Sequence, residues 1–388
     1  MRLYSIKYII VLLALSTGKA LFAQPAFIKW APEIIVHDQP VSMESVKDTA
    51  LERSVRFRRT YGSEYGRMLQ LTNGNWLAAY TVSGNDGYLK DVNGGFELEI
   101  AQSMDGGKTW KKIGLISDKG RDLDNAQMIQ LPDKSILLSC RSVRWQESYR
   151  LPVYKSKDGK SWEKVSVIDT NEGKPGELGK PDKGVYEPHF NILADGRLAV
   201  MYASEKHVTD SLPYSQIIAQ KVSPDFGKTW GPEIWVAYEP GRYASRPGMP
   251  VWTRMKTGEY IAVYEICGPE QCGVYFKTSK DGFNWPVGFG SLIPQQTGGP
   301  YIVSLGDGTL VVTSNRGNIS VSNDYGLTWQ LGERPWPHEV DFSKDWTQTI
   351  WSSLYPVNKA GVVAMTAMKR KQGGHNIRIR FGQVEHKK

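Results

Sequence analysis

One short motif recurs five times in this chain of 388 residues: Ser103-Met-Asp-Gly-Gly-Lys-Thr-Trp110, Ser156-Lys-Asp-Gly-Lys-Ser-Trp162, Ser223-Pro-Asp-Phe-Gly-Lys-Thr-Trp230, Ser279-Lys-Asp-Gly-Phe-Asn-Trp285 and Ser322-Asn-Asp-Tyr-Gly-Leu-Thr-Trp329. Each copy has Asp and Gly at its centre. This pair favours a tight hairpin, because the Asp side chain bonds nearby backbone amides and Gly adopts positive φ. The Trp that ends each copy packs the turn onto a sheet and buries a large apolar surface. Five copies indicate a repeating β architecture.

A second, longer repeat is a hairpin of two apolar strands. Its six copies have turns at residues 74, 134, 196, 258, 308 and 361. Five of these hairpins are followed by the short motif. The pattern predicts an all-β fold, a six-bladed β-propeller in which the long hairpin forms the two inner strands and the short motif joins the two outer ones. A two-sheet sandwich is the alternative, and it accounts poorly for the sixfold repetition.

The sixth hairpin lacks the short motif, so its sheet needs a strand from elsewhere. We expect the segment Glu33-Ile-Ile-Val36 to supply this strand and close the ring. Residues 24–388 are then expected to form a single propeller domain, despite a length that would allow two or three domains.

Residues 1–23 have the pattern of a signal peptide. Arg2 and Lys7 precede the apolar run 8–15, and Ala23 offers a small residue for cleavage before Gln24. The apolar run is too short to span a bilayer as a helix, and no cysteine follows the cleavage point to carry a lipid. We therefore expect an exported protein, periplasmic, on the cell surface or secreted, with no membrane insertion after cleavage.

The composition is that of a soluble globular protein, with 40% hydrophobic and 23% charged residues. Loss of residues 1–23 reduces the net charge of +8, leaving 45 basic against 40 acidic residues. No basic stripe interleaved with aromatic residues is present, which argues against a nucleic-acid partner. We expect a monomer.

The three cysteines are too few for a disulfide scaffold. Cys267 and Cys272 could close a small loop or remain thiols, and Cys140 is left unpaired. No set of residues has the spacing of a zinc site.

The blade plan places the start of every first strand and the end of every second strand on one rim. Three carboxylates fall on this rim: Glu187, Glu205 and Glu265. Antiparallel counting across the turn at 195–196 places Glu187 roughly opposite residue 204, and so beside Glu205. Burying an acidic group beside an apolar strand costs desolvation energy unless a partner compensates its charge, so such a group is retained for pairing or for a function. We therefore expect paired-carboxylate chemistry.

Further polar and aromatic candidates share this rim, and they suit a carbohydrate ligand: Arg67, Asp124, Asn125, Arg141, Arg144, Trp145, His189, Arg246, Met249, Tyr301, Arg316 and Trp351. The arginines could instead neutralise the glutamates structurally. His189 and His207 could suggest a metal, but we interpret them as hydrogen-bond partners.

The short motifs resemble the Asp-boxes of sialidase-type propellers, a resemblance that covers essentially the whole mature chain. A sharper resemblance rests on two stretches, Tyr186-Glu187-Pro188 with Ser204-Glu205, and Arg246-Pro-Gly-Met-Pro250 leading to Tyr264-Glu265. They look like glycoside hydrolase family 93, whose members are secreted exo-α-1,5-L-arabinanases that release arabinobiose with retention of configuration. The loop from Cys267 to Cys272 departs from the family pattern.

The resemblance implies catalytic roles for the glutamates. Glu265 would be the nucleophile, Glu187 the general acid/base and Glu205 a tuning or positioning group, with the swap of the first two roles left open. A retaining enzyme needs two carboxyl groups about 5–5.5 Å apart. No metal or organic cofactor is implied.

Two other functions stay in competition. A true sialidase would need an arginine triad, and the first blade has Tyr65-Gly66-Arg67 where sialidases show Arg-Ile-Pro or a close variant. A non-catalytic glycan-binding propeller would use the rim glutamates only to pair with arginines.

Overall fold

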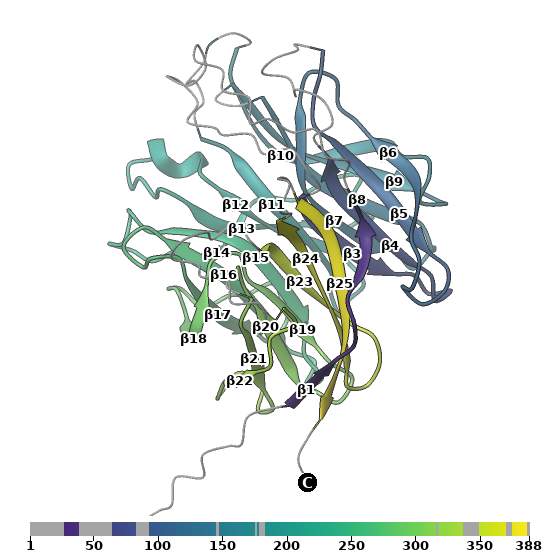
Figure 1. Cartoon of the computed structure of the whole chain (residues 1–388). Coiled ribbons are helices and arrows are strands. Elements are labelled where there is room, and N and C mark those ends of the chain that lie inside the picture. The colour runs from purple at the N-terminus through teal and green to yellow at the C-terminus, as the bar shows by residue number, and fades with distance from the viewer. Residues whose placement is uncertain are drawn as a thin grey trace, which may run out of the picture.

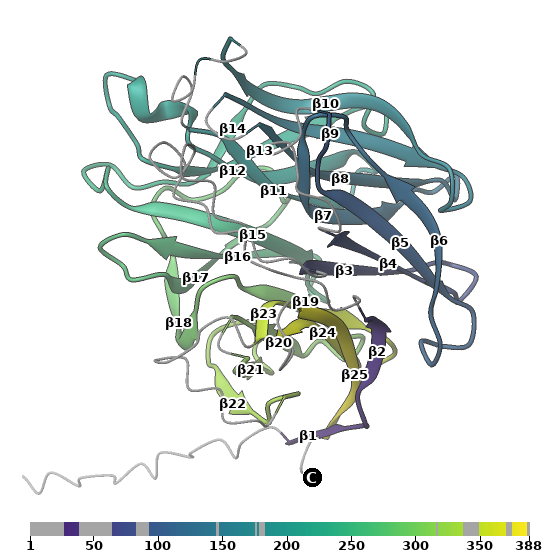
Figure 2. The ribbon, with the colours of Figure 1, turned by 45° about the horizontal axis from the view of Figure 1, so that its top comes forward.

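The computed structural model describes residues 27–38, 64–82, 93–144, 147–174, 177, 183–315, 317–336, 349–369 and 375–385. These residues form six antiparallel sheets that follow one another around a ring in chain order (Figures 1 and 2). The predicted six-bladed β-propeller is confirmed. The expected signal peptide, residues 1–23, lies outside the described residues, as do Trp145 and Arg316.

Each of the first five blades is built from four strands in succession. Blade 1 contains β3 (Glu64–Gln70), β4 (Trp76–Val82), β5 (Glu97–Ser103) and β6 (Lys111–Ile116). Blade 2 contains β7 (Asp122–Gln130), β8 (Ile136–Arg144), β9 (Ser148–Ser156) and β10 (Glu163–Glu172). Blade 3 contains β11 (Val185–Ile192), β12 (Leu198–Ser204), β13 (Ile217–Ser223) and β14 (Ile234–Ala237), with the short 3-10 helix η1 (Lys206–Thr209) after β12.

The remaining blades continue this plan. Blade 4 contains β15 (Arg246–Arg254), β16 (Tyr260–Cys267), β17 (Gly273–Ser279) and β18 (Ser291–Thr297). Blade 5 contains β19 (Tyr301–Ser304), β20 (Leu310–Thr313), β21 (Ile319–Ser322) and β22 (Gln330–Gly332). Blade 6 contains β23 (Thr349–Pro356), β24 (Gly361–Lys369) and β25 (His375–Glu385).

The N-terminal segment completes blade 6. Both β1 (Phe27–Trp30) and β2 (Ile34–His37) pair with β25, so the purple and yellow ends of the chain lie side by side (Figure 1). The expected strand at 33–36 is therefore present, shifted by one residue and preceded by a second pairing segment. The innermost strands contact one another from blade to blade, and β23 contacts β3, which closes the ring.

The Asp-box turns form as the motif predicts. Ser103 Oγ donates to Asp105 Oδ1 at 2.7 Å and accepts from Gly107 N at 2.9 Å. Asp105 Oδ1 also accepts from Thr109 N at 3.0 Å, and the other four copies repeat this arrangement. Because side chains within the motif satisfy the backbone donors, the turn conformation is encoded locally.

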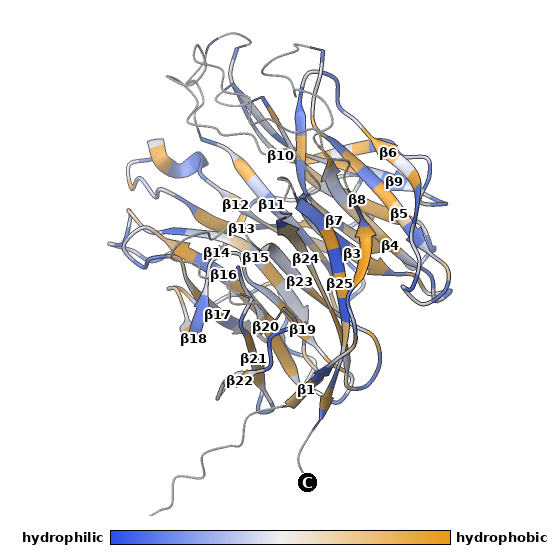
Figure 3. Cartoon of the chain, viewed as in Figure 1, coloured by the Kyte–Doolittle hydropathy of each residue, from blue (hydrophilic) through white to orange (hydrophobic). Residues whose placement is uncertain are grey.

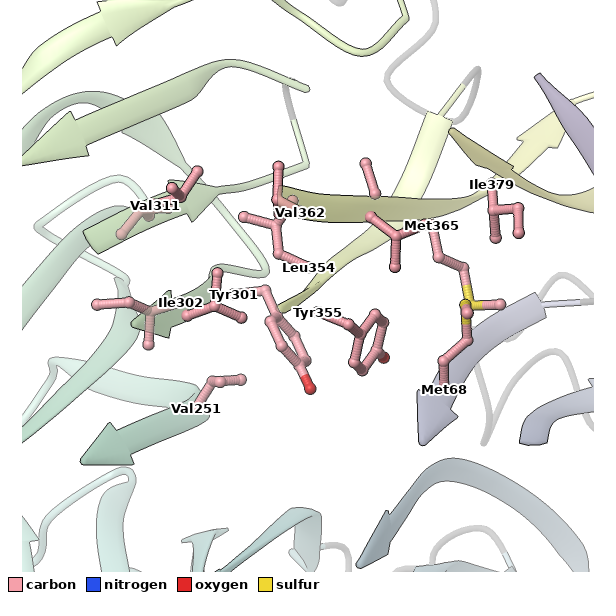
Figure 4. Packing of buried hydrophobic residues seen from close by; sticks show 14 of the residues in the cluster. Met68, Val251, Tyr301, Ile302, Val311, Leu354, Tyr355, Val362, Met365 and Ile379 are labelled. Carbon is pink, nitrogen blue, oxygen red and sulfur yellow. The ribbon is translucent and has the colours of Figure 1, made fainter. Parts of the chain in front are cut away.

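The hydrophobic core lies between adjacent sheets. The second strands β4, β12 and β20 are buried along their whole length, because each lies between two strands of its own sheet and two neighbouring blades. Hydrophobic colour accordingly lies mainly on the strands (Figure 3). In Figure 4, Met68 of β3 meets Met365 of β24, and Tyr301 lies beside Tyr355.

Cys267 and Cys272 form a disulfide, which settles the alternative left open by the sequence, and Cys140 is a buried free thiol. Among the described residues, no helix has the length and apolarity needed to cross a membrane.

Candidate active site

The inner strands share a backbone feature that builds the rim. In five of them the pairing register shifts around one non-glycine residue with φ between 51° and 60°: Tyr65, Asn125, Glu187, Met249 and Trp351. Gly299, with φ 38°, takes the same place just before β19. Such bulges re-aim side chains, and a left-handed non-glycine residue costs of order 1–3 kcal/mol. The same left-handed backbone thus recurs around the ring, once in each blade.

Two rim carboxylates accept a hydrogen bond from the bulge of the next blade. Glu187 Oε2 accepts from Met249 N at 2.7 Å. Glu265 Oε2 accepts from Gly299 N at 2.6 Å. Asn315, which follows β20, holds the next bulge similarly, because its Oδ1 accepts from Trp351 N at 3.0 Å. The two glutamates are thereby fixed to backbone rather than to mobile side chains.

Gly248 leaves the space between the two carboxylates open. A Cβ atom at this position would stand 3.6 Å from Glu187 Oε2 and 3.6 Å from Glu265 Oε1. The two oxygens are therefore separated by no more than twice this distance. The same Cβ would lie 2.8 Å from Gln216 Nε2, so a side chain here would displace the Gln216 amide from its hydrogen bond to Pro247 O. Both glutamates keep part of their surface exposed, within reach of a ligand.

The two carboxyl groups differ electrostatically. Burial, followed by the nearby charge of Glu265, raises the pKa of Glu187 to about 7. Burial also raises the pKa of Glu265, but the Gly299 amide and the charge of Arg246 oppose this rise. Near neutral pH, Glu187 is thus the group poised to carry a proton.

Glu205 lies next to this pair, in contact with Arg246 and Tyr186. Its Oε1 pairs with Arg246 Nη2 at 2.6 Å, and its Oε2 accepts from Tyr186 Oη at 2.8 Å. The expected register was wrong, since Val185 rather than Glu187 lies opposite Ser204. The bulge at Glu187 and Pro188 shifts the pairing, and simple counting cannot foresee it. Glu205 makes only a small contribution to the raised pKa of Glu187.

A buried cluster is formed by residues that stand two positions after the bulges. Arg67, His189 and Tyr301 all stand at this offset and are buried. The Tyr301 ring contacts the His189 ring, with centroids 5.7 Å apart, and Arg67 Cζ lies 5.3 Å from the Tyr301 centroid. Burial and the charge of Arg67 lower the pKa of His189 to about 3, so its imidazole is neutral.

Arg67 is a buried cation that forms no ion pair with a carboxylate of the described residues. Its Nη1 donates to Gly66 O at 2.8 Å and to Trp351 O at 2.9 Å, and Cζ lies 3.8 Å from the Tyr65 centroid. Carbonyl dipoles and an aromatic face thus balance its charge.

The remaining candidates are divided between the rim and its supports. Arg141 pairs with Asp124 at 2.9 Å and lies 5.8 Å from the Tyr186 centroid. Asn125 is buried, and its N–H donates to Asp124 Oδ1 at 2.7 Å. Arg144 pairs with Glu147. Met249 is buried, and its Sδ lies 4.0 Å from Tyr65 Oη. Trp351 is partly exposed, and its ring centroid lies 5.8 Å from that of Tyr65. No contact joins Arg144 to the carboxylate pair in the part of the chain described.

The expected role as a hydrogen-bond partner is confirmed for His207 but is wrong for His189, whose two ring nitrogens are buried and have no hydrogen-bond partner among the described residues. His207 lies between Asp210 at 2.7 Å and Glu233 at 2.6 Å. Over the described ranges, no group of three or more His, Cys, Asp or Glu side chains has the geometry of a metal site.

Several residues at the site were not among the predicted site residues: Tyr65, Gln216, Gly248, Gly299, Asn315 and Tyr355. A signal for the bulges is nevertheless present. Tyr65, Asn125, Glu187, Met249 and Gly299 each stand nine residues before the turn residue of their own hairpin. Because the spacing repeats while the residue type changes, motif comparison does not find it.

No family model matches the sequence, and no curated protein matches it. Solved structures are similar in fold. The α-L-arabinanase of Penicillium chrysogenum, complexed with arabinobiose, aligns with a TM-score of 0.70 and 22% identity over 92% of this chain and 98% of that one. The family 93 α-L-arabinofuranosidase of Fusarium graminearum, also with arabinobiose, aligns with a TM-score of 0.69 and 22% identity over 90% and 97%. The NanB sialidase of Streptococcus pneumoniae aligns at 0.56 with 10% identity, over 88% of this chain and 70% of that one.

Proposed function

We propose that this protein is a retaining glycoside hydrolase, an exo-α-1,5-L-arabinanase of the family 93 type. The observation that carries the proposal is the pair Glu187 and Glu265, which face each other across Gly248 and are each held by a backbone amide. The arabinobiose bound by two proteins of the same fold supports arabinan as the substrate.

Glu265 is the proposed nucleophile. The Gly299 amide and Arg246 stabilise its anionic form, which favours attack on the anomeric carbon. The bond from that carbon to the leaving oxygen breaks as the glycosyl-enzyme ester forms. A retaining pair about 5–5.5 Å apart is compatible with the limit that Gly248 sets.

Glu187 is the proposed general acid and base. Its raised pKa keeps a proton available, which passes to the leaving oxygen in the first step. In the second step, the Glu187 carboxylate takes a proton from water, the water oxygen bonds to the anomeric carbon, and Glu265 departs as a carboxylate.

We further propose that the protein acts after export. The N-terminal pattern of residues 1–23 supports this location, and the Cys267–Cys272 disulfide suits an oxidising compartment.

The test is product analysis of the purified mature chain on linear α-1,5-arabinan, beside the Glu265→Ala variant. Arabinobiose from the wild type and none from the variant is the expected result. An intact polymer would remove arabinan as the substrate, and sialyl and aryl glycosides would then be assayed. Inactivity on all of them, with glycan binding retained, would leave a binding propeller.

A further inference from the structure

A disulfide-closed loop lies beside the proposed nucleophile. The hairpin of β16 and β17 pairs from Tyr260 opposite Ser279 to Ile266 opposite Gly273. Cys267 and Cys272 stand just beyond the last pair and are joined across it. Cys267 is only two residues after Glu265, and both half-cystines are partly exposed. The proposed catalytic steps do not use this loop.

The C-terminal half of the loop holds the backbone that binds Glu265. Cys272 O accepts a hydrogen bond from Gly298 N at 2.8 Å. The next amide, Gly299 N, is the donor to Glu265 Oε2 at 2.6 Å. Asn315 N donates to Gly298 O at 3.1 Å and ties the same segment to blade 5. The path from Cys272 to the carboxylate therefore contains two hydrogen bonds and one peptide unit.

Cys267 and Glu270 tie the loop to the other side of the site. Cys267 pairs with Arg246, the cation that opposes the rise in the pKa of Glu265. Glu270 Oε1 accepts from Ser245 Oγ at 2.8 Å and also binds Arg242. The loop thus spans both groups that stabilise the Glu265 anion.

We propose that the Cys267–Cys272 disulfide is a positioning element for Glu265, holding the Gly298–Gly299 backbone and Arg246 at the carboxylate. It restrains a loop of only six residues at the end of a hairpin with seven paired positions. Such a short loop constrains the unfolded chain little, so its main effect is local order rather than global stability. The proposal rests on the function proposed above.

The experiment compares the oxidised protein with the protein reduced by dithiothreitol. Two electrons and two protons from the reagent turn the S–S bond into two thiols, while the reagent becomes a cyclic disulfide. We expect kcat to fall about 3- to 10-fold with little change in KM, because a small displacement of a reacting group slows chemistry more than binding. Reoxidation should restore kcat, with the thiol count following in parallel.

A pH profile distinguishes a loss of positioning at Glu265 from a general loosening of the protein. Within the described part of the chain, the charged groups around Glu265 are Glu187 of β11, Arg246 of β15 and, behind Arg246, Glu205 after β12. Loss of the Gly299 hydrogen bond should raise the pKa of Glu265, so the acidic limb of kcat/KM should move to higher pH in the reduced protein. A purely structural disulfide would leave this limb in place.

Variants provide the second arm. The Cys267→Ser/Cys272→Ser double variant should reproduce the reduced enzyme and not respond to dithiothreitol, whereas Cys140→Ala should behave as wild type. If the double variant does not fold, the reduction and reoxidation of the wild type still decide. Equal kcat and equal acidic limbs in an active enzyme would overturn the positioning role. An oxidised wild type that is inactive on every glycoside would instead overturn the proposed function.

Discussion

The Asp-box turns on one face of the ring and the bulges at the opposite rim both recur from blade to blade, five times and six times respectively, but they repeat in different ways. The Asp-box turns repeat their side chains, because Ser, Asp and Gly themselves create the turn. The bulges repeat only a backbone conformation, at positions occupied by Tyr65, Asn125, Glu187, Met249 and Trp351. At Met249, Gly299 and Trp351 a hydrogen bond from the preceding blade holds this conformation, so the side chain at the bulge itself is free to vary. The fold can therefore be predicted from the residues of the Asp-box turns, whereas the side chains at the bulges can change with the reaction or ligand.

The sharpest test of this comparison replaces the two rim glutamates by glutamine. Glu187→Gln and Glu265→Gln keep an oxygen that can accept from Met249 N and Gly299 N, so the free energy of unfolding should change by less than about 1 kcal/mol. Each should lower kcat by about 10²–10⁴-fold or more, because neither proton transfer nor nucleophilic attack is then possible. Steady-state kinetics and denaturant unfolding measure the two effects. A large loss of stability with modest loss of activity would mean that the carboxylates serve mainly to hold the bulges.

The raised pKa of Glu187 makes a second prediction at the rim. The general acid must be protonated in the first step, so kcat/KM should fall as the pH rises through about 7. The positive charge of Arg141 lowers the pKa of Glu187, so Arg141→Gln should move this alkaline limb to higher pH. Initial rates measured across the pH range test this. A limb that stays in place in Arg141→Gln would show that another group titrates.

A substitution in an Asp-box turn should instead lower stability and leave activity unchanged. Asp225 accepts hydrogen bonds from Lys228 N at 3.1 Å, Thr229 N at 2.8 Å and Thr229 Oγ1 at 2.7 Å. Asp225→Ala should lower the free energy of unfolding by about 1–3 kcal/mol, since these donors lose their acceptor. Activity per folded molecule should not change. Asp225→Asn is the graded control, because it retains one acceptor oxygen and should lose less stability.

The sequence predicts the ring because its signals are local. Five Asp-boxes and six hairpin turns place almost every strand, and the missing strand of blade 6 follows from counting. The rim is harder to predict, because its contacts join residues far apart in the chain, such as Glu265 with Gly299. Glu187 and Glu265 were foreseen as residues. The sequence did not predict the bulge that turns Glu187 toward Met249, or the open space at Gly248 between the two carboxylates.

The smallest effect comes from a turn that departs from the repeat. Lys134 has φ 69° where the corresponding turns of blades 1, 3, 4 and 5 have glycine, and its side chain is exposed. Lys134→Gly should raise the free energy of unfolding by about 0.5–1 kcal/mol, because glycine adopts this conformation without the Cβ clash. Lys160→Gly is the matched control, since Lys160 is an exposed turn residue whose φ is not positive, and it should not gain stability. Activity should be unchanged in both variants. The left-handed backbone at Glu187 carries a carboxylate that faces Glu265 across Gly248, whereas at Lys134 it carries an exposed lysine. Relief of the strain at Lys134 should therefore cost no activity. Lower stability in Lys134→Gly would show that positive φ is as well tolerated by lysine as by glycine here, and that backbone strain does not distinguish the two faces.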